Sequence, residues 1–211
     1  MINFSQWLMN IIQTIAIIIA SGAAIYGINS WRREAKGRTI LDLSEKTLAL
    51  FYEAKDNITS IRNPANLSGK GSTRPKSDDE TEEETKRFNQ GYIVTERYNV
   101  LRHRFYELFS LKYTYMAVFG KENGKHFDEL RKIINEIRIA NYMLVTYYRN
   151  PQYNKPENFK SQQEFEKFHK GLQEHERVIW EHGDDDEINL RIDNIITEVE
   201  KVCELASKKA K

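Results

Sequence analysis

The sequence contains a single cysteine, Cys203, so the chain cannot form an internal disulfide bond. This is consistent with a reducing compartment. Cys203 stands at helical spacing from Val199 and Ala206, and no histidine adjoins it to activate the thiol, so we expect a buried packing residue. An excess of charge is also missing, because 32 Lys and Arg stand against 31 Asp and Glu. Without a basic excess, the chain is not expected to bind nucleic acid.

Charged side chains are missing from the whole segment Met1–Trp31 and dense after it. Its apolar core, Leu8–Ile28, has about 21 residues and would span about 31 Å as a helix, which matches the hydrocarbon core of a bilayer. Trp7 stands at one edge, and Tyr26 and Trp31 stand at the other, as interfacial aromatics do. The pattern therefore predicts a transmembrane anchor over residues 1–31, with the lipid bilayer as its partner.

Two alternatives to this anchor remain open. A cleaved signal peptide would carry a basic segment before the apolar stretch, and none is present, although the small residues Ala20–Ala23 could form a cleavage site. A buried helix of a soluble protein is less favoured, because the apolar character continues around the whole helix.

The flanks of the anchor predict its orientation. Four cations follow the span directly, namely Arg32, Arg33, Lys36 and Arg38, and only uncharged residues precede it. Positively charged flanks stay on the cytoplasmic side, so we expect a single-pass membrane protein with a cytoplasmic C-terminal domain.

One face of the predicted anchor is small or polar. It comprises Asn10, Gln13, Ala16, Ala20, Ala24 and Gly27. Small residues four apart allow two membrane helices to approach closely, and an amide can form a hydrogen bond across such an interface. The face is therefore a candidate surface for a homo-oligomer, and the alternative is that alanine and glycine are simply common in membrane helices.

The remainder of the chain predicts only helices. Residues 32–62 carry a helical apolar stripe that includes Phe51 and Ile58, and Asn63-Pro64 ends it. Residues 63–84 resemble an acidic, flexible loop, because apolar residues are nearly absent there. Residues 85–211 predict a helical bundle, with helices at about 84–119, 126–149, 161–183 and from 184–187 onward. The fold class is therefore all-α, with the transmembrane helix continuing into a cytoplasmic bundle of about five helices.

Sequence signatures of catalysis are absent. We find no P-loop, no dinucleotide-binding glycines, no Gly-x-Ser-x-Gly and no His-Glu-x-x-His, so a non-enzymatic protein without a cofactor is favoured. The richest polar cluster holds His182, Asp184, Asp185 and Asp186, which makes it a weak candidate for a metal-dependent site. It lacks the register of a calcium loop and the paired ligands of a zinc site, so a helix end followed by an acidic first turn is the simpler interpretation.

Tyrosine is abundant in the middle third of the chain, from Tyr92 to Tyr153. Such rings line ligand pockets and interfaces, but they also fill the cores of helical bundles with the hydroxyl at the surface. We expect the core role.

Several short segments resemble a group of bacterial membrane-anchored helical proteins with no assigned activity. They are Trp31-Arg32-Arg33-Glu34, Leu48 to Asp56, Ile61-Arg62-Asn63-Pro64, Met116 to Gly120 and Trp180 to Glu187. The resemblance covers most of the chain. It implies a single N-terminal membrane helix and a bacterial inner-membrane setting, and it implies no activity.

Three hypotheses for function follow. The leading one is a membrane-tethered interaction or scaffold protein that presents its bundle to an unidentified cytoplasmic protein partner and self-associates. The second is a membrane-perturbing effector of stress or phage defence, because Asn10 and Gln13 are polar residues within the span. The third is a metal-dependent enzyme that uses the acidic turn near His182.

Overall fold

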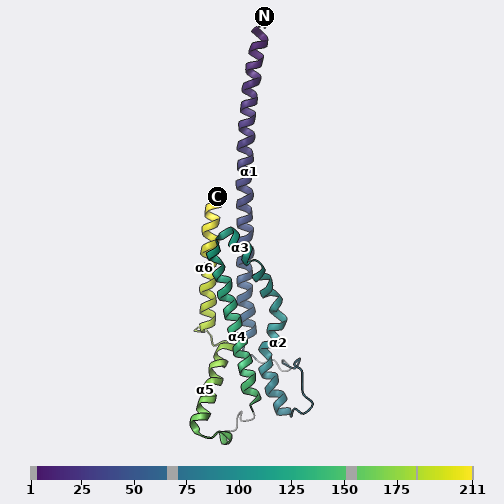
Figure 1. The fold of residues 1–211 in the computed structure, drawn as a ribbon, viewed down its shortest axis with the longest axis vertical. Helices are drawn as coiled ribbons and strands as arrows, with labels where there is room; N and C mark the ends of the chain where they lie inside the picture. The colour runs from purple at the N-terminus through teal and green to yellow at the C-terminus, as the bar shows by residue number, and fades with distance from the viewer. Residues whose placement is uncertain (1–3, 66–70, 151–155, 184, 211) are drawn as a thin grey trace. The chain divides into compact units, whose positions relative to one another are not determined.

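The computed structural model describes residues 4–65, 71–150, 156–183 and 185–210, and most of them are helical (Figure 1). The α-helices are α1 (Phe4–Arg62), α2 (Glu82–Ser110), α3 (Lys112–Phe119), α4 (Lys125–Arg149), α5 (Gln162–Ile179) and α6 (Glu187–Ala210), with short 3-10 turns at Lys121–Gly124 and Pro156–Asn158. No strand occurs in these four ranges. The all-α prediction is confirmed, and so is the prediction that the apolar N-terminal helix continues into the amphipathic one.

The chain divides into two compact units, of which the first comprises residues 1–45 and 203–211. Within it, the large apolar side chains of α1 from Phe4 to Trp31 are exposed, apart from the half-exposed Ile11. Farther along the same unit, Leu43 and Ser44 of α1 and Cys203 of α6 are buried. Cys203 therefore has the buried position that its helical spacing predicts.

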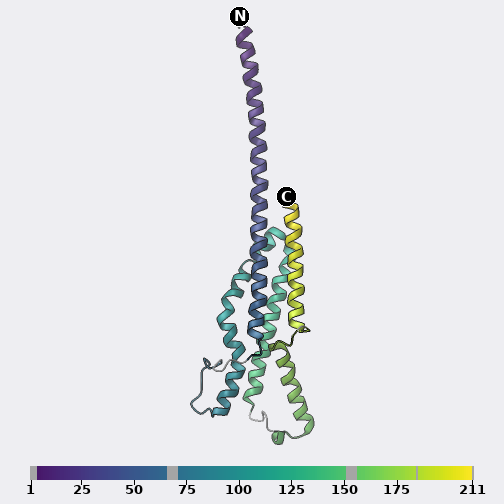
Figure 2. The same cartoon turned by 180° about the vertical axis from the view of Figure 1, so that it is seen from behind.

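The second unit, residues 46–202, is a helical bundle. Its part of α1 lies beside α2, α4 and α6 in both views (Figures 1 and 2), and α4 packs against α2 and α5. The Phe127 ring of α4 is fully buried, with its centroid 5.0 Å from that of Phe51 and 5.3 Å from that of Tyr115. This aromatic cluster joins α1, α3 and α4 in the core.

Two predicted helix boundaries are wrong. The helix expected over residues 84–119 breaks at Leu111, where α2 ends and α3 begins, and the redirected chain buries Tyr115 against Phe127. The helix expected to end at Gly183 ends at Ile179, because Trp180 leaves the helical conformation with φ −106° and ψ 144°. Gly183 instead takes a positive φ of 91° in the turn before α6. The start of α5 agrees with the predicted start of this helix, and Ser161 caps it, since its hydroxyl accepts a hydrogen bond from the Glu164 N–H.

The segment 71–80, within the predicted acidic loop, holds a buried arginine that the sequence did not indicate. The Arg74 guanidinium donates to Asn89 Oδ1 at 2.8 Å and to the Glu80 carboxylate, at 2.8 Å for Nη1 to Oε1. Hydrogen bonds from Arg74 and from the Ser77 N–H lower the pKa of Glu80 from 4.5 to about 2. This lowered pKa means that the stabilisation by the carboxylate is present above pH 4.5 and is lost as the pH falls toward 2.

Replacing Arg74 by glutamine is expected to raise the pKa of Glu80 part of the way from about 2 back toward 4.5, because the bonds from Ser77 and Thr85 remain. A carbon-detected NMR titration of the Glu80 carboxyl measures this change. Lys76→Gln removes an exposed cation from the same loop and should leave the Glu80 pKa where it is. An unchanged Glu80 pKa in Arg74→Gln would contradict the contact.

Candidate functional site

The apolar start of α1 is the first feature that bears on function. By length and composition, α1 is the one helix in the described ranges that could cross a membrane. The residues of the small or polar face, from Asn10 to Gly27, are all exposed, and a side chain added at Gly27 would meet open space. The four flanking cations are exposed as well, and Arg38 pairs with Glu34 one turn earlier, at 2.6 Å.

The acidic turn is organised around Arg62, at the C-terminal end of α1. The Arg62 side chain is fully buried, and its Nη1 and Nη2 each donate to one oxygen of Asp186 at 2.7 Å. Arg62 also donates from Nε to the Val178 carbonyl and from Nη2 to the Trp180 carbonyl, both at 2.9 Å. The Arg62 guanidinium therefore links the C-terminal end of α1 to the connection between α5 and α6 by hydrogen bonds.

Asp186 also caps α6, because its Oδ1 accepts a hydrogen bond from the Asn189 N–H at 3.0 Å, and its Oδ2 accepts one from the His182 N–H of the preceding turn at 3.1 Å. Burial raises the pKa of Asp186, but the hydrogen bonds from Arg62 and from these two N–H groups outweigh burial and lower it. His182 and Asp185 are exposed, and Asp184 lies outside the described residues. In the described part of the chain, no group of three His, Cys, Asp or Glu residues could hold a metal ion. The geometry of Asp186 is that of a structural ion pair.

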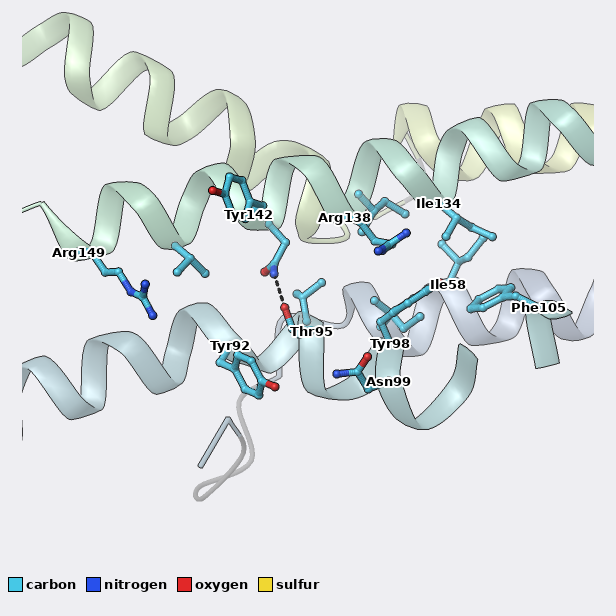
Figure 3. Close-up of a pocket in the computed structure, with 15 residues that line it drawn as sticks. Ile58, Tyr92, Thr95, Tyr98, Asn99, Phe105, Ile134, Arg138, Tyr142 and Arg149 are labelled. Atoms are coloured by element: carbon cyan, nitrogen blue, oxygen red, sulfur yellow. Dashed lines mark hydrogen bonds between the residues drawn. The ribbon is translucent and has the colours of Figure 1, made fainter. Parts of the chain in front are cut away.

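A cavity of about 380 Å³ lies among α1, α2 and α4, and its sides are formed by all three helices (Figure 3). Its apolar lining is mostly branched aliphatic, with Ile58 from α1, Val94 from α2 and Ile137 from α4 among the residues. Tyr92 and Tyr98 line it too and are only half-buried. The expectation that tyrosines fill the core is therefore correct for Tyr115 and Tyr148, which are buried, but not for these two.

The polar groups of this cavity are few and face one another across it. Asn141 is 4% exposed, and its Nδ2 donates to the Thr95 hydroxyl at 2.7 Å (Figure 3). Its Oδ1 is buried and has no hydrogen-bond partner among the described residues. Arg138 lies over the ring of Tyr98, 4.9 Å from its centroid, and Arg149 lies 5.8 Å from that of Phe88. Neither arginine forms an ion pair with a carboxylate of the described residues.

An apolar cavity with a few convergent polar groups has the make-up of a small-molecule site. Sequence reasoning missed Asn141, Arg138 and Arg149. The abundance of tyrosine was the one sequence signal for this cavity, and it does not distinguish a lined pocket from a filled core.

Comparisons with protein-family models, with curated proteins and with solved structures found no match. The resemblance to membrane-anchored helical proteins therefore stays a prediction.

Proposed function

We propose that this protein is a membrane-tethered interaction protein of the bacterial inner membrane, with residues 46–202 on the cytoplasmic side. One observation carries the proposal: the large apolar side chains along the start of α1 are exposed, with Ile18 and Ile19 at 66% and Ile25 at 62%. A helix that is apolar all round and covered by nothing is stable in hydrocarbon rather than in water. Exposed rings on the helical unit, such as Tyr106, support a protein partner there.

The end of the span and its proposed orientation are supported by the cations that follow it. Isoleucine, leucine and phenylalanine each favour the centre of the bilayer by about 0.3–0.6 kcal/mol, whereas each arginine or lysine opposes it by about 2.5–3.5 kcal/mol. This cost keeps Arg32, Arg33, Lys36 and Arg38 out of the hydrocarbon, and the preference of such cations for the cytoplasmic side supports the orientation. With a C-terminal epitope, the protein should stay in the membrane pellet after an alkaline wash. The epitope should resist protease in spheroplasts and be digested after lysis. Release into the supernatant would refute the tether.

Self-association through the span is the second part of the proposal. Asn10 and Gln13 carry side-chain amides that form no hydrogen bond with the described residues, and an amide in hydrocarbon is stabilised when a second helix supplies a partner. On the same face, Gly27 is open to close approach.

Gly27→Leu is expected to reduce the crosslinked dimer in membranes several-fold, because a leucine on this face separates two packed helices. The structure offers a matched control in Gly22, which is equally open and lies about 140° away from Gly27 around the helix at 100° per residue. Gly22→Leu should leave the dimer intact. Crosslinking through a cysteine introduced near Trp7, in a Cys203→Ala background, measures both. Equal yields from the two leucine variants would contradict this face.

The exposed amides of Asn10 and Gln13 also favour a second candidate, a membrane-perturbing effector in which they line a polar path across the bilayer. Overexpression would then depolarise cells, and Gln13→Leu would abolish the effect. A potential-sensitive dye decides between the two, because a protein that only tethers leaves the membrane potential unchanged.

A further inference from the structure

We propose that the cavity among α1, α2 and α4 binds a small amphiphilic carboxylate that also carries an N–H donor, the chemistry of an N-acyl amino acid. The proposal goes beyond the tethering function and does not depend on it. Three properties of the cavity select this ligand: an aliphatic lining, a buried acceptor without a partner, and two cations without a carboxylate.

The lining selects an apolar body of limited size. Ile58, Ile61, Val94, Ile134, Ile137 and Val145 give the cavity its aliphatic surface. Its volume of about 380 Å³ equals that of roughly a dozen water molecules at about 30 Å³ each, and it falls within the range of small-molecule pockets. Water would be poorly held against such a surface, so a short acyl chain that replaces it gains from burial.

The unpartnered oxygen of Asn141 selects a donor. In the structure Nδ2 donates to Thr95, and Oδ1 belongs to a side chain that is 96% buried. Buried acceptors in proteins nearly always have a partner. An N–H group beside the acyl chain of the ligand would supply it.

The charges of the cavity select an acid. Its lining includes two arginines and no aspartate or glutamate, so an anion meets no repulsion there. Arg138 precedes Asn141 by three residues on α4, so the two lie on neighbouring positions of one face, about 4.5 Å apart along the axis. Arg149 lies about 12 Å along the axis from Asn141, toward the other end of the cavity (Figure 3). In an N-acylglycine, the carboxylate is two bonds from the amide nitrogen, so it reaches Arg138 and not Arg149.

The test is a binding measurement with three matched probes on the full-length protein in lipid nanodiscs, with empty nanodiscs subtracted. N-hexanoylglycine has the acyl chain, the N–H and the carboxylate. N-hexanoyl-N-methylglycine lacks the N–H, and N-hexanoylglycinamide lacks the charge. We expect N-hexanoylglycine to bind about tenfold more tightly than either analogue, as one hydrogen bond or one ion pair predicts. The absence of saturable binding at millimolar concentration, or equal binding of all three probes, overturns the proposal.

Three variants test which residues cause the preference for the N–H and the preference for the carboxylate. Asn141→Leu should abolish the preference for the N–H probe while the N-methyl probe still binds, which also shows that the cavity remains formed. Arg138→Gln should abolish the preference for the carboxylate over the amide, and Arg149→Gln is the matched control that keeps both preferences. A preference for the N–H that survives in Asn141→Leu, or a loss of charge preference in Arg149→Gln alone, refutes the assignment. Because the comparison of the three probes uses the unaltered protein, the test stands even where a variant does not fold.

Discussion

Replacing Arg62 by methionine is expected to lower the free energy of unfolding of the helical unit by about 3–5 kcal/mol. Methionine keeps much of the side-chain volume but leaves the buried Asp186 carboxylate without its cation. It also leaves the carbonyls of Val178 and Trp180 without the donors that now bind them. Denaturant unfolding of the full-length protein in detergent, followed by circular dichroism, measures the loss.

An exposed ion pair of the same unit provides the control. Lys55 pairs with Asp193 at 2.5 Å, but both side chains remain more than a third exposed, so Lys55→Met should cost less than about 1 kcal/mol. Combining Arg62→Met with Asp186→Asn should be less destabilising than the sum of the two single changes, because the uncompensated charge is then absent. Strict additivity, or a loss in Arg62→Met no larger than that in Lys55→Met, would show that the pair is not structural.

The ion pair of Arg62 and Asp186 also makes the stability of the helical unit depend on pH. The pKa of Asp186 is lowered from its ordinary 3.8, so the carboxylate contributes stability that is present above about pH 4 and is lost as the pH falls through the lowered value. The Asp186→Asn variant has no carboxylate at this position. Its free energy of unfolding should therefore fall less than that of the unaltered protein as the pH is lowered.

Helical periodicity explains why much of the core could be predicted. The stripe on residues 126–149 includes Phe127, Leu130 and Leu144, and all three are fully buried in α4. Periodicity failed at Leu111, because no glycine or proline marks the break there. The position of the break depends on the contact between Tyr115 and Phe127. These residues are twelve positions apart, so a local sequence pattern does not contain their contact.

Arg62 could not be predicted for a related reason. It follows Ile58 and Ile61 on the buried stripe, but arginine is nearly always exposed, and its partner Asp186 lies in an acidic run where any carboxylate could have served. The cavity could not be predicted either, because it depends on the distance between α2 and α4. Tyr92 and Tyr98 follow the apolar stripe of α2, as Phe105 does, yet only Phe105 is fully buried.

Phe127→Ala is the other substitution with a large expected effect, a loss of about 3–5 kcal/mol in the free energy of unfolding. The ring is 0% exposed, and it contacts Phe51 and Tyr115 edge-on at 69° and 61°, so its removal opens a cavity where α1, α3 and α4 meet. Phe127→Leu should cost less than Phe127→Ala, because it restores most of the volume while losing the ring contacts.

The control is Tyr106→Ala, which removes a ring that is 63% exposed and should change stability by less than about 0.5 kcal/mol. The double variant Phe51→Ala, Phe127→Ala decides whether the two rings act together. Because each ring lines the space that the other would leave, the second truncation should cost less than it does alone, by about 0.5–1.5 kcal/mol. Independent losses from the two rings would mean that α1 and α4 are held together by contacts other than this cluster.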